Sequence, residues 1–237
     1  MRLQLGFSTG CLHKCGLALK EQLAAIASAG CRAVEINCLR MDFFESEELR
    51  TLTADDIAKH DFQYISIHSP KFDYGPNDET KKILDGLHRL NRELLANLVA
   101  VHPDQVTDMN ILAQAGFHVG LENMDNRKTA YQTPKEFEPV FAEHPGWSLV
   151  LDVNHIYSND VSMGLAVEFY KKFGPRITQV HLSGYAGCHE PLFQTLQPQI
   201  IWAIQNLDVP IIVESVFEHP DELLRERDYI LKVLGSR

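Results

Sequence analysis

Ionisable residues of three types close six apolar segments of this chain. The segments end, in order, at His68, His102, Glu122, Asp152, His181 and Glu214. With 32 acidic residues and 11 histidines among 237, chance would close six segments in this way with a probability on the order of a few in 10⁵. Charged side chains are rarely buried unless they are paired or coordinate a metal. Because these residue types are also the ligands that divalent cations bind in proteins, the pattern predicts a metal site.

The apolar segments alternate with amphipathic stretches at a pitch of roughly 30 residues, which is typical of βα units. The expected strands are Leu3–Ser8, Ala33–Asn37, Tyr64–His68, Leu98–His102, Val119–Glu122, Leu149–Asp152, Ile177–His181 and Ile211–Glu214. The expected helices are Leu17–Ser28, Glu45–Lys59, Glu79–Asn91, Gln105–Ala115, one opened by the capping box of Thr133 and Glu136, Val161–Phe173, Gln199–Asn206 and Asp221–Leu234.

Eight such units predict an α/β protein with a single (β/α)8 TIM barrel over residues 1–237. A doubly wound open sheet is the alternative, but two units would be left without a place. Such sheets also usually begin with a glycine-rich turn, whereas the first strand here leads into Ser8-Thr9-Gly10-Cys11.

In a barrel, the carboxyl ends of the strands gather at one rim, about 4.8 Å apart. Glu122, Asp152, His181 and Glu214 would form an arc suited to one Mn²⁺, Mg²⁺, Fe²⁺ or Zn²⁺ ion. His68 and His102 would lie beside Glu122, which could bridge to a second ion. His155 and His189, expected in the loops after the sixth and seventh strands, could serve a third ion or contact substrate.

The ordered motifs around these residues resemble the xylose-isomerase-like TIM-barrel superfamily, which includes sugar isomerases and epimerases and the endonuclease IV family. The motifs are Ile67-His68-Ser69-Pro70, Val101-His102-Pro103, Leu121-Glu122-Asn123, Leu151-Asp152-Val153-Asn154-His155, His181-Leu182 and Val213-Glu214-Ser215. The resemblance spans the chain from the first strand to the last.

By resemblance to the epimerase branch, Glu122, Asp152, His181 and Glu214 would hold one ion. The two glutamates would exchange a carbon-bound proton of the substrate, and His155 would bind a substrate oxygen. The chain departs from that branch after His181, where many epimerases carry an arginine that grips sugar oxygens.

By resemblance to the endonuclease IV branch, eight residues match the ligands of three Zn²⁺ ions that cleave a phosphodiester. They are His68, His102, Glu122, Asp152, His155, His181, His189 and Glu214. The ninth position falls on Gly187, and the sequence is short for loops that would grip a bent duplex.

The first hypothesis is therefore a divalent-metal-dependent isomerase or epimerase of a sugar or sugar phosphate. A multinuclear zinc phosphoester hydrolase and a non-catalytic metal- or sugar-binding barrel are the alternatives. Lys71, Tyr185 and Glu35 are further candidates for substrate binding. Surface roles are the alternative for Lys71 and Tyr185, and a buried ion pair with Arg32 or Lys71 is the alternative for Glu35.

The composition limits the kinds of partner and the compartment that we expect for this protein. The net charge of −10, with no basic run longer than two residues, weighs against binding to duplex nucleic acid. No apolar run approaches 18 residues, so no membrane span is expected, and the first residues form too short an apolar run for a signal peptide. Five cysteines without a Cys-x-x-Cys pair indicate a reduced, cytoplasmic chain.

Overall fold

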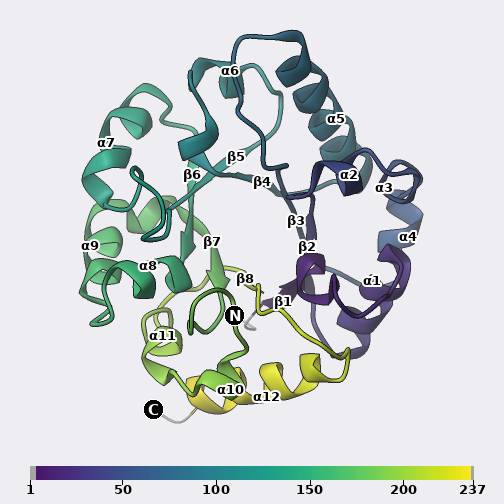
Figure 1. Cartoon of the computed structure of the whole chain (residues 1–237), viewed down its shortest axis with the longest axis vertical. Coiled ribbons are helices and arrows are strands. Elements are labelled where there is room, and N and C mark those ends of the chain that lie inside the picture. Colours follow the sequence, from purple (N-terminus) through teal and green to yellow (C-terminus); the bar gives the residue numbers. More distant parts are fainter. Residues whose placement is uncertain (1–3, 236–237) are drawn as a thin grey trace.

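Eight parallel strands follow one another around a closed barrel, in which β1 also pairs with β8 (Figure 1). This computed structural model describes residues 4–235. The strands are β1 (Leu5–Ser8), β2 (Ala33–Asn37), β3 (Tyr64–His68), β4 (Leu98–Val101), β5 (Val119–Glu122), β6 (Ser148–Asp152), β7 (Ile177–Leu182) and β8 (Ile211–Val213). The predicted TIM barrel is confirmed, and each expected strand agrees within two residues at either end. Leu3, the expected start of the first strand, lies outside the described residues.

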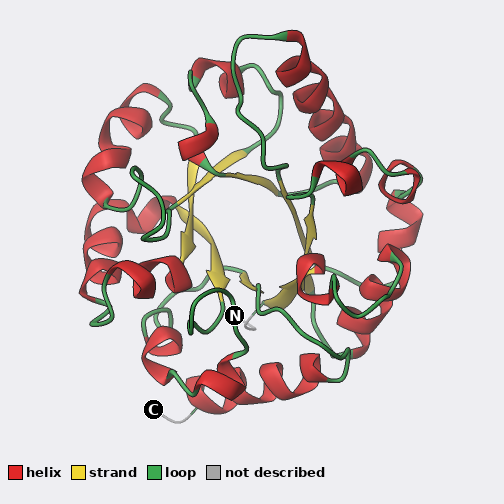
Figure 2. Cartoon of the chain, viewed as in Figure 1, coloured by secondary structure: helices red, strands yellow, loops and turns green. Residues whose placement is uncertain are grey.

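Helices surround the ring of strands on its outside (Figure 2). They are α1 (Leu19–Ser28), α2 (Met41–Phe44), α3 (Glu47–Arg50), α4 (Ala54–Ala58), α5 (Asp78–Leu94), α6 (Asn110–Ala113), α7 (Pro134–Glu143), α8 (Val153–Asn159), α9 (Gly164–Phe173), α10 (Leu192–Thr195), α11 (Pro198–Trp202) and α12 (Glu222–Leu234). Short 3₁₀ helices add η1 (Thr9–Leu12), η2 (Pro103–Gln105) and η3 (Gly174–Arg176). No helix within residues 4–235 is long and apolar enough to cross a membrane.

The prediction of a continuous helix over 45–59 is wrong, because the chain starts two helices there. Ser46 caps α3 by accepting a hydrogen bond from the Leu49 backbone N–H. Thr53 then caps α4 in the same way, through the backbone N–H of Asp56. A side chain that accepts from the backbone in this way satisfies a helix start, so each cap begins a new helix.

The expected helix over 105–115 is also mostly absent, and only α6 forms. Its first half is held instead against the loop after β3, where Val106 makes a parallel bridge with Tyr74. The Thr107 hydroxyl adds a hydrogen bond of 3.0 Å to the Tyr74 carbonyl oxygen. Tertiary pairing has thus replaced the local helical preference.

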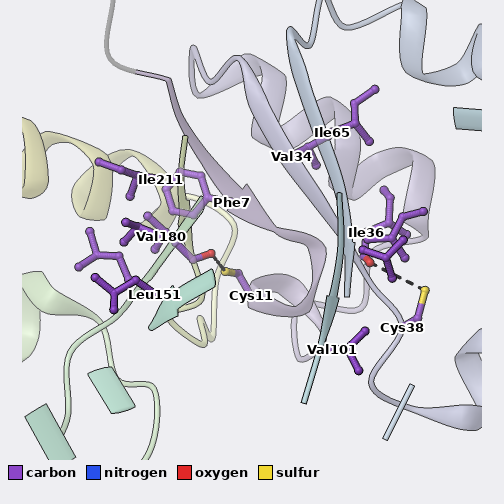
Figure 3. Packing of buried hydrophobic residues seen from close by; sticks show 14 of the residues in the cluster. Phe7, Cys11, Val34, Ile36, Cys38, Ile65, Val101, Leu151, Val180 and Ile211 are labelled. Atoms are coloured by element: carbon purple, nitrogen blue, oxygen red, sulfur yellow. Dashed lines mark hydrogen bonds between the residues drawn. The ribbon is translucent and has the colours of Figure 1, made fainter. Parts of the chain in front are cut away.

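The strands bury two different faces. Their outer face joins the helices in the main apolar core, part of which Figure 3 shows with Val34, Ile36, Ile65, Val101, Leu151, Val180 and Ile211 labelled. The inside of the barrel holds two small apolar clusters, which are Ala33, Tyr64 and Ile212, and Leu98, Ala100 and Val150.

Gly120 gives space to the second of these clusters. A Cβ atom at Gly120 would lie 2.8 Å from a methyl carbon of Val150 and 2.9 Å from Leu98. Side chains two residues apart on a strand share a face, so Glu122 follows Gly120 on the inner face. The glycine lets the barrel interior close directly beneath that carboxylate.

Candidate metal centre

The residues that close strands β3 to β8 meet at the carboxyl rim. Glu122, Asp152, His181 and Glu214 each present one ligand atom, and these atoms lie within 4.8 Å of one another. His68, His102 and Glu122 form a second such group, and a third consists of His68, His181 and Glu214. The structure therefore brings together all six residues that the sequence pattern selected.

Glu122 is the centre of this arrangement, and its side chain is buried. Its Oε2 atom lies 3.2 Å from Nε2 of His68 and 3.4 Å from Nε2 of His102. Its Oε1 atom lies 3.3 Å from Nδ1 of His181 and 3.4 Å from Nδ1 of His155. Glu122 belongs to two of the three groups, and its two oxygens face the ligand atoms of both, as those of a bridging ligand would.

Several buried polar atoms of the first group have no hydrogen-bond partner among the described residues. They are Oε1 of Glu122, Oδ2 of Asp152 and Nδ1 of His181. Leaving one buried acceptor unpaired costs about 1–3 kcal/mol, and more for a charged group. Three such atoms facing one another fit a divalent cation, and three carboxylates with one imidazole suit Mn²⁺, Mg²⁺, Fe²⁺ or Zn²⁺.

The carboxyl groups also influence one another's ionisation. Burial raises the pKa of Glu214 and of Asp152. Burial acts on Glu122 in the same direction, but the neighbouring His181 and His102 outweigh it and hold the pKa of Glu122 well below its usual range. These directions describe the metal-free protein, and a bound cation would favour the ionised form of every carboxylate.

Asp152 has a second task, because it caps helix α8. Its Oδ1 atom accepts a hydrogen bond of 2.8 Å from the backbone N–H of His155, which leaves Oδ2 to face the site. His155 therefore lies in a helix, and the expectation that it lies in a loop is wrong. Nδ1 of His155 lies 2.8 Å from the carbonyl oxygen of Asn123, a contact that requires an Nδ1–H donor and leaves Nε2 as the acceptor of the ring.

Two asparagines that the sequence analysis did not select hold the site together. Asn123 clamps the end of β6, since its side-chain amide donates to the Asp152 carbonyl oxygen and accepts from the Asp152 N–H, at 2.9 and 2.8 Å. Asn154 donates to the carbonyl oxygens of Gly184 and Cys188, which ties the loop after β7 to α8. Their only signal in the sequence is that each lies one or two residues after a ligand candidate.

His189 reaches the site from the loop after β7, where it was expected. Its ring lies 5.6 Å from that of His155, centroid to centroid. Its Nδ1 atom lies 2.9 Å from the Ser183 hydroxyl, and burial lowers the pKa of His189 to about 3. His189 is not a member of any of the three ligand groups among the described residues.

A cavity of about 520 Å³ opens above the site. It is lined by Leu39, Arg40, His68, Lys71, His102, Glu122, Met124, Asp125, Arg127, Lys128, His155, Cys188, His189 and Glu214. Lys71, a candidate for substrate binding, thus lines this cavity. Three further basic residues of this lining, Arg40, Arg127 and Lys128, were not selected from the sequence.

The other two candidates for substrate binding lie elsewhere. Tyr185 is not in the cavity lining; its ring faces that of Tyr157 at 6.1 Å, and its backbone pairs with the side chain of Gln197. Glu35 lies within β2 and is fully buried inside the barrel. Of the two ion pairs expected for Glu35, neither forms, since Arg32 pairs with Asp61 and the buried partner of Glu35 is His181.

Comparison with known proteins identifies solved structures that share this fold. No protein-family model matches the chain, and no curated protein matches its sequence. Among solved structures it is similar to endonuclease IV from Thermus thermophilus, with a TM-score of 0.74, 16% identity, and 99% of this chain and 100% of that chain covered. A xylose isomerase domain containing protein from Salmonella typhimurium gives a TM-score of 0.71 at 14% identity, covering 99% of each chain.

A D-psicose 3-epimerase in the presence of D-fructose gives a TM-score of 0.68 at 12% identity, with 99% of this chain and 100% of that chain covered. Coverage of nearly the whole chain in every case means that the barrel is shared from its first strand to its last. The chain therefore has the same TIM-barrel fold as these three proteins.

Proposed function

We propose that the protein is a divalent-metal-dependent isomerase or epimerase that acts on a sugar or sugar phosphate. The observation that carries the proposal is the convergence of ligand atoms from Glu122, Asp152, His181 and Glu214 within 4.8 Å of one another. Two of these four residues, Glu122 and Glu214, are glutamates at the ends of different strands, and both line the cavity. They could therefore both hold an ion and reach a substrate above it.

A bound divalent cation would polarise the carbonyl and hydroxyl oxygens of the substrate and so acidify the hydrogen on the adjacent carbon. Glu122 ends β5 and Glu214 follows β8, three strands away around the barrel. The two carboxyl groups therefore approach the cavity from different sides. In this proposal the carboxylate of one glutamate removes the proton from carbon, and the carboxyl group of the other returns a proton to the opposite face, which inverts that carbon.

His155 would orient the substrate. Its Nδ1–H is committed to the Asn123 carbonyl oxygen, and its ring lines the cavity beside Asp125, with Nε2 at 4.0 Å from the Asp125 carboxylate. The free nitrogen could then accept a hydrogen bond from a substrate hydroxyl group.

The basic residues of the cavity support a phosphorylated substrate over a neutral sugar. Arg127 and Lys128 pair with Asp125 and Asp104, whereas the Lys71 ammonium group forms no ion pair among residues 4–235. An unpaired cation at the mouth of the cavity would bind a phosphate group in the substrate.

Solvent exchange tests the proposal directly. In D₂O the metal-loaded protein should incorporate deuterium at the carbon next to the carbonyl group of a ketose or ketose phosphate. Glu214→Gln should abolish conversion of the ketose to its epimer, while the same change at Glu218, an exposed residue paired with Lys14, should leave it intact. Epimerisation that persists in Glu214→Gln would contradict the two-glutamate mechanism.

A second function is favoured by the group of His68, His102 and Glu122, because an epimerase with one ion does not require it. A hydrolase of phosphoesters would use such a group to bind a second zinc ion beside the first. Elemental analysis separates the two proposals. One Mn or Fe per chain supports the isomerase, and two or three Zn per chain with phosphoesterase activity supports the hydrolase.

A further inference from the structure

The inside of the barrel holds a carboxylate where TIM barrels usually pack apolar layers. Glu35 is buried on the inner face of β2, two residues after Ala33 and directly opposite Ser66 of β3 in the sheet register. A buried carboxylate costs several kcal/mol unless other groups compensate it. We therefore expect Glu35 to have specific hydrogen-bonding or charged partners.

Glu35 Oε2 has three polar neighbours. The Ser66 hydroxyl donates to it at 2.9 Å and the Gln179 amide nitrogen at 2.8 Å. Nε2 of His181 lies 3.1 Å away. Gln179 and His181 lie two residues apart on β7 and so both point inward. The carboxylate thus lies directly beneath the histidine of the candidate metal centre.

The two nitrogens of the His181 ring have different surroundings. Nδ1 faces Glu122 and Glu214, at 3.3 and 3.5 Å, and has no hydrogen-bond partner among the described residues. Nε2 faces Glu35 and also lies 2.7 Å from the Gln179 amide nitrogen. If Nδ1 binds a cation, the proton of the neutral ring must be on Nε2, and a carboxylate is the group that accepts it best.

Gln179 is not an equivalent acceptor. Its amide oxygen already accepts a hydrogen bond of 2.9 Å from the Tyr64 hydroxyl, which turns its NH₂ group toward Glu35 and His181. An NH₂ group can donate to Nε2 only when the ring proton is on Nδ1, the form that cannot bind a metal through Nδ1. Glu35 is therefore the residue of this network that favours the metal-binding form of the ring.

We propose that Glu35 is a positioning residue that orients His181 and keeps its proton on Nε2, so that Nδ1 is free to bind the divalent cation. Carboxylates that hold a metal-bound histidine in this way commonly affect metal affinity by a factor of roughly 10–100. This inference rests on the metal centre of the proposed function but not on the reaction, because it concerns metal binding in the absence of substrate.

The first test needs no variant. In protein labelled with ¹⁵N-histidine and loaded with Zn²⁺, long-range ¹H–¹⁵N correlation should show His181 protonated at Nε2, with a slowly exchanging proton shifted downfield. Protonation at Nδ1, or metal bound through Nε2, would overturn the proposal.

The second test measures Zn²⁺ affinity by competition with a chelator, with folding monitored by circular dichroism. Glu35→Met, which removes the acceptor at similar size, should weaken binding about 10-fold or more. Glu35→Gln keeps a neutral acceptor and should fall between Glu35→Met and the wild type. Ser148→Ala, which removes a buried hydroxyl in contact with His118 at the start of β6 and outside this network, should leave affinity unchanged.

These measurements distinguish the role of Glu35 from the existence of the metal centre and from the proposed reaction. Folded Glu35→Met that binds Zn²⁺ as tightly as the wild type would refute the role of Glu35 and leave the metal centre standing. Equal losses in Glu35→Met and Ser148→Ala would mean that the loss of affinity follows general destabilisation, which also refutes positioning. A wild-type protein that takes up no metal would refute both the metal centre and the role of Glu35, whereas metal uptake without exchange activity would refute only the proposed reaction.

Discussion

The carboxylate of Asp152 caps the helix that carries His155. One oxygen accepts the His155 backbone N–H at 2.8 Å, and the other is buried, faces the candidate metal centre and has no hydrogen-bond partner among the described residues. A single side chain thus joins the strand end to the helix start and contributes to the site. The two contributions can be separated by substitution.

Asp152→Asn should keep the cap and weaken the metal centre, because asparagine caps helices as well as aspartate but is a poorer metal ligand. Asp152→Ala should lose both. In the presence of a chelator, Asp152→Ala should therefore unfold with about 1 kcal/mol less free energy than Asp152→Asn. Urea unfolding of the two variants measures this difference. Equal stabilities would show that the cap contributes nothing.

Removal of the metal should destabilise the protein. An ion at 100 times its dissociation constant would stabilise the folded state by about 2.7 kcal/mol, which corresponds to roughly 5–10 °C in Tm for a chain of this size. Calorimetry with added Mn²⁺, Zn²⁺ or EDTA measures the shift. The shift should be much smaller in His181→Ala than in the wild type, and a shift that is equally large in both would place the stabilising ion elsewhere.

Lys71 should discriminate between phosphorylated and neutral substrates. Lys71→Gln removes the unpaired ammonium group, and losing one charged hydrogen bond of about 1.5–3 kcal/mol should raise KM for a phosphorylated substrate roughly 10-fold or more. KM for the matching neutral sugar should not change. Lys172→Gln, which disrupts an exposed pair with Glu138, is the matched control. A similar loss on both substrates would argue against a phosphate contact.

Low pH should destabilise the folded protein, in part through Asp56, a residue that does not line the cavity. The Asp56 carboxylate pairs with Lys20 and Lys59, both at 2.9 Å, and the hydrogen bond from Lys20 and then that from Lys59 hold its pKa well below the usual range. Because the folded pKa is lower than the unfolded value of about 3.9, this stabilisation is present above about pH 4 and is lost as the pH falls below it.

Substitution of Asp56 tests this dependence. Asp56→Asn should be less stable than the wild type at neutral pH, and the difference should shrink as urea unfolding is repeated at lower pH. Asp55→Asn, a change at the neighbouring position in the same helix, should lack this trend. A difference for Asp56→Asn that is independent of pH would mean that the ion pairs do not contribute.

Much of the barrel could be predicted because its signals are local. A buried parallel strand is a short apolar run, and a residue that closes it lies at the rim by geometry alone. The capping box of Thr133 and Glu136 likewise predicted the start of α7, and the structure confirms it. The helices over 45–59 and 105–115 could not be predicted as they are, because caps within the segment and the pairing of Val106 with Tyr74 override helical preference.

The sequence by itself determined which residues reach the rim, since strand order and the alternation of side chains place Glu122, Asp152 and His181 there once a barrel is assumed. Only the tertiary structure decided what each one meets. Glu35 and His181 are 146 positions apart on strands that do not pair with each other, and they meet only because the sheet closes and brings both inner faces into one interior. The sequence carries no local signal for a contact across a closed barrel, and for that reason it could not distinguish a substrate contact of Glu35 from a buried ion pair or identify His181 as its partner.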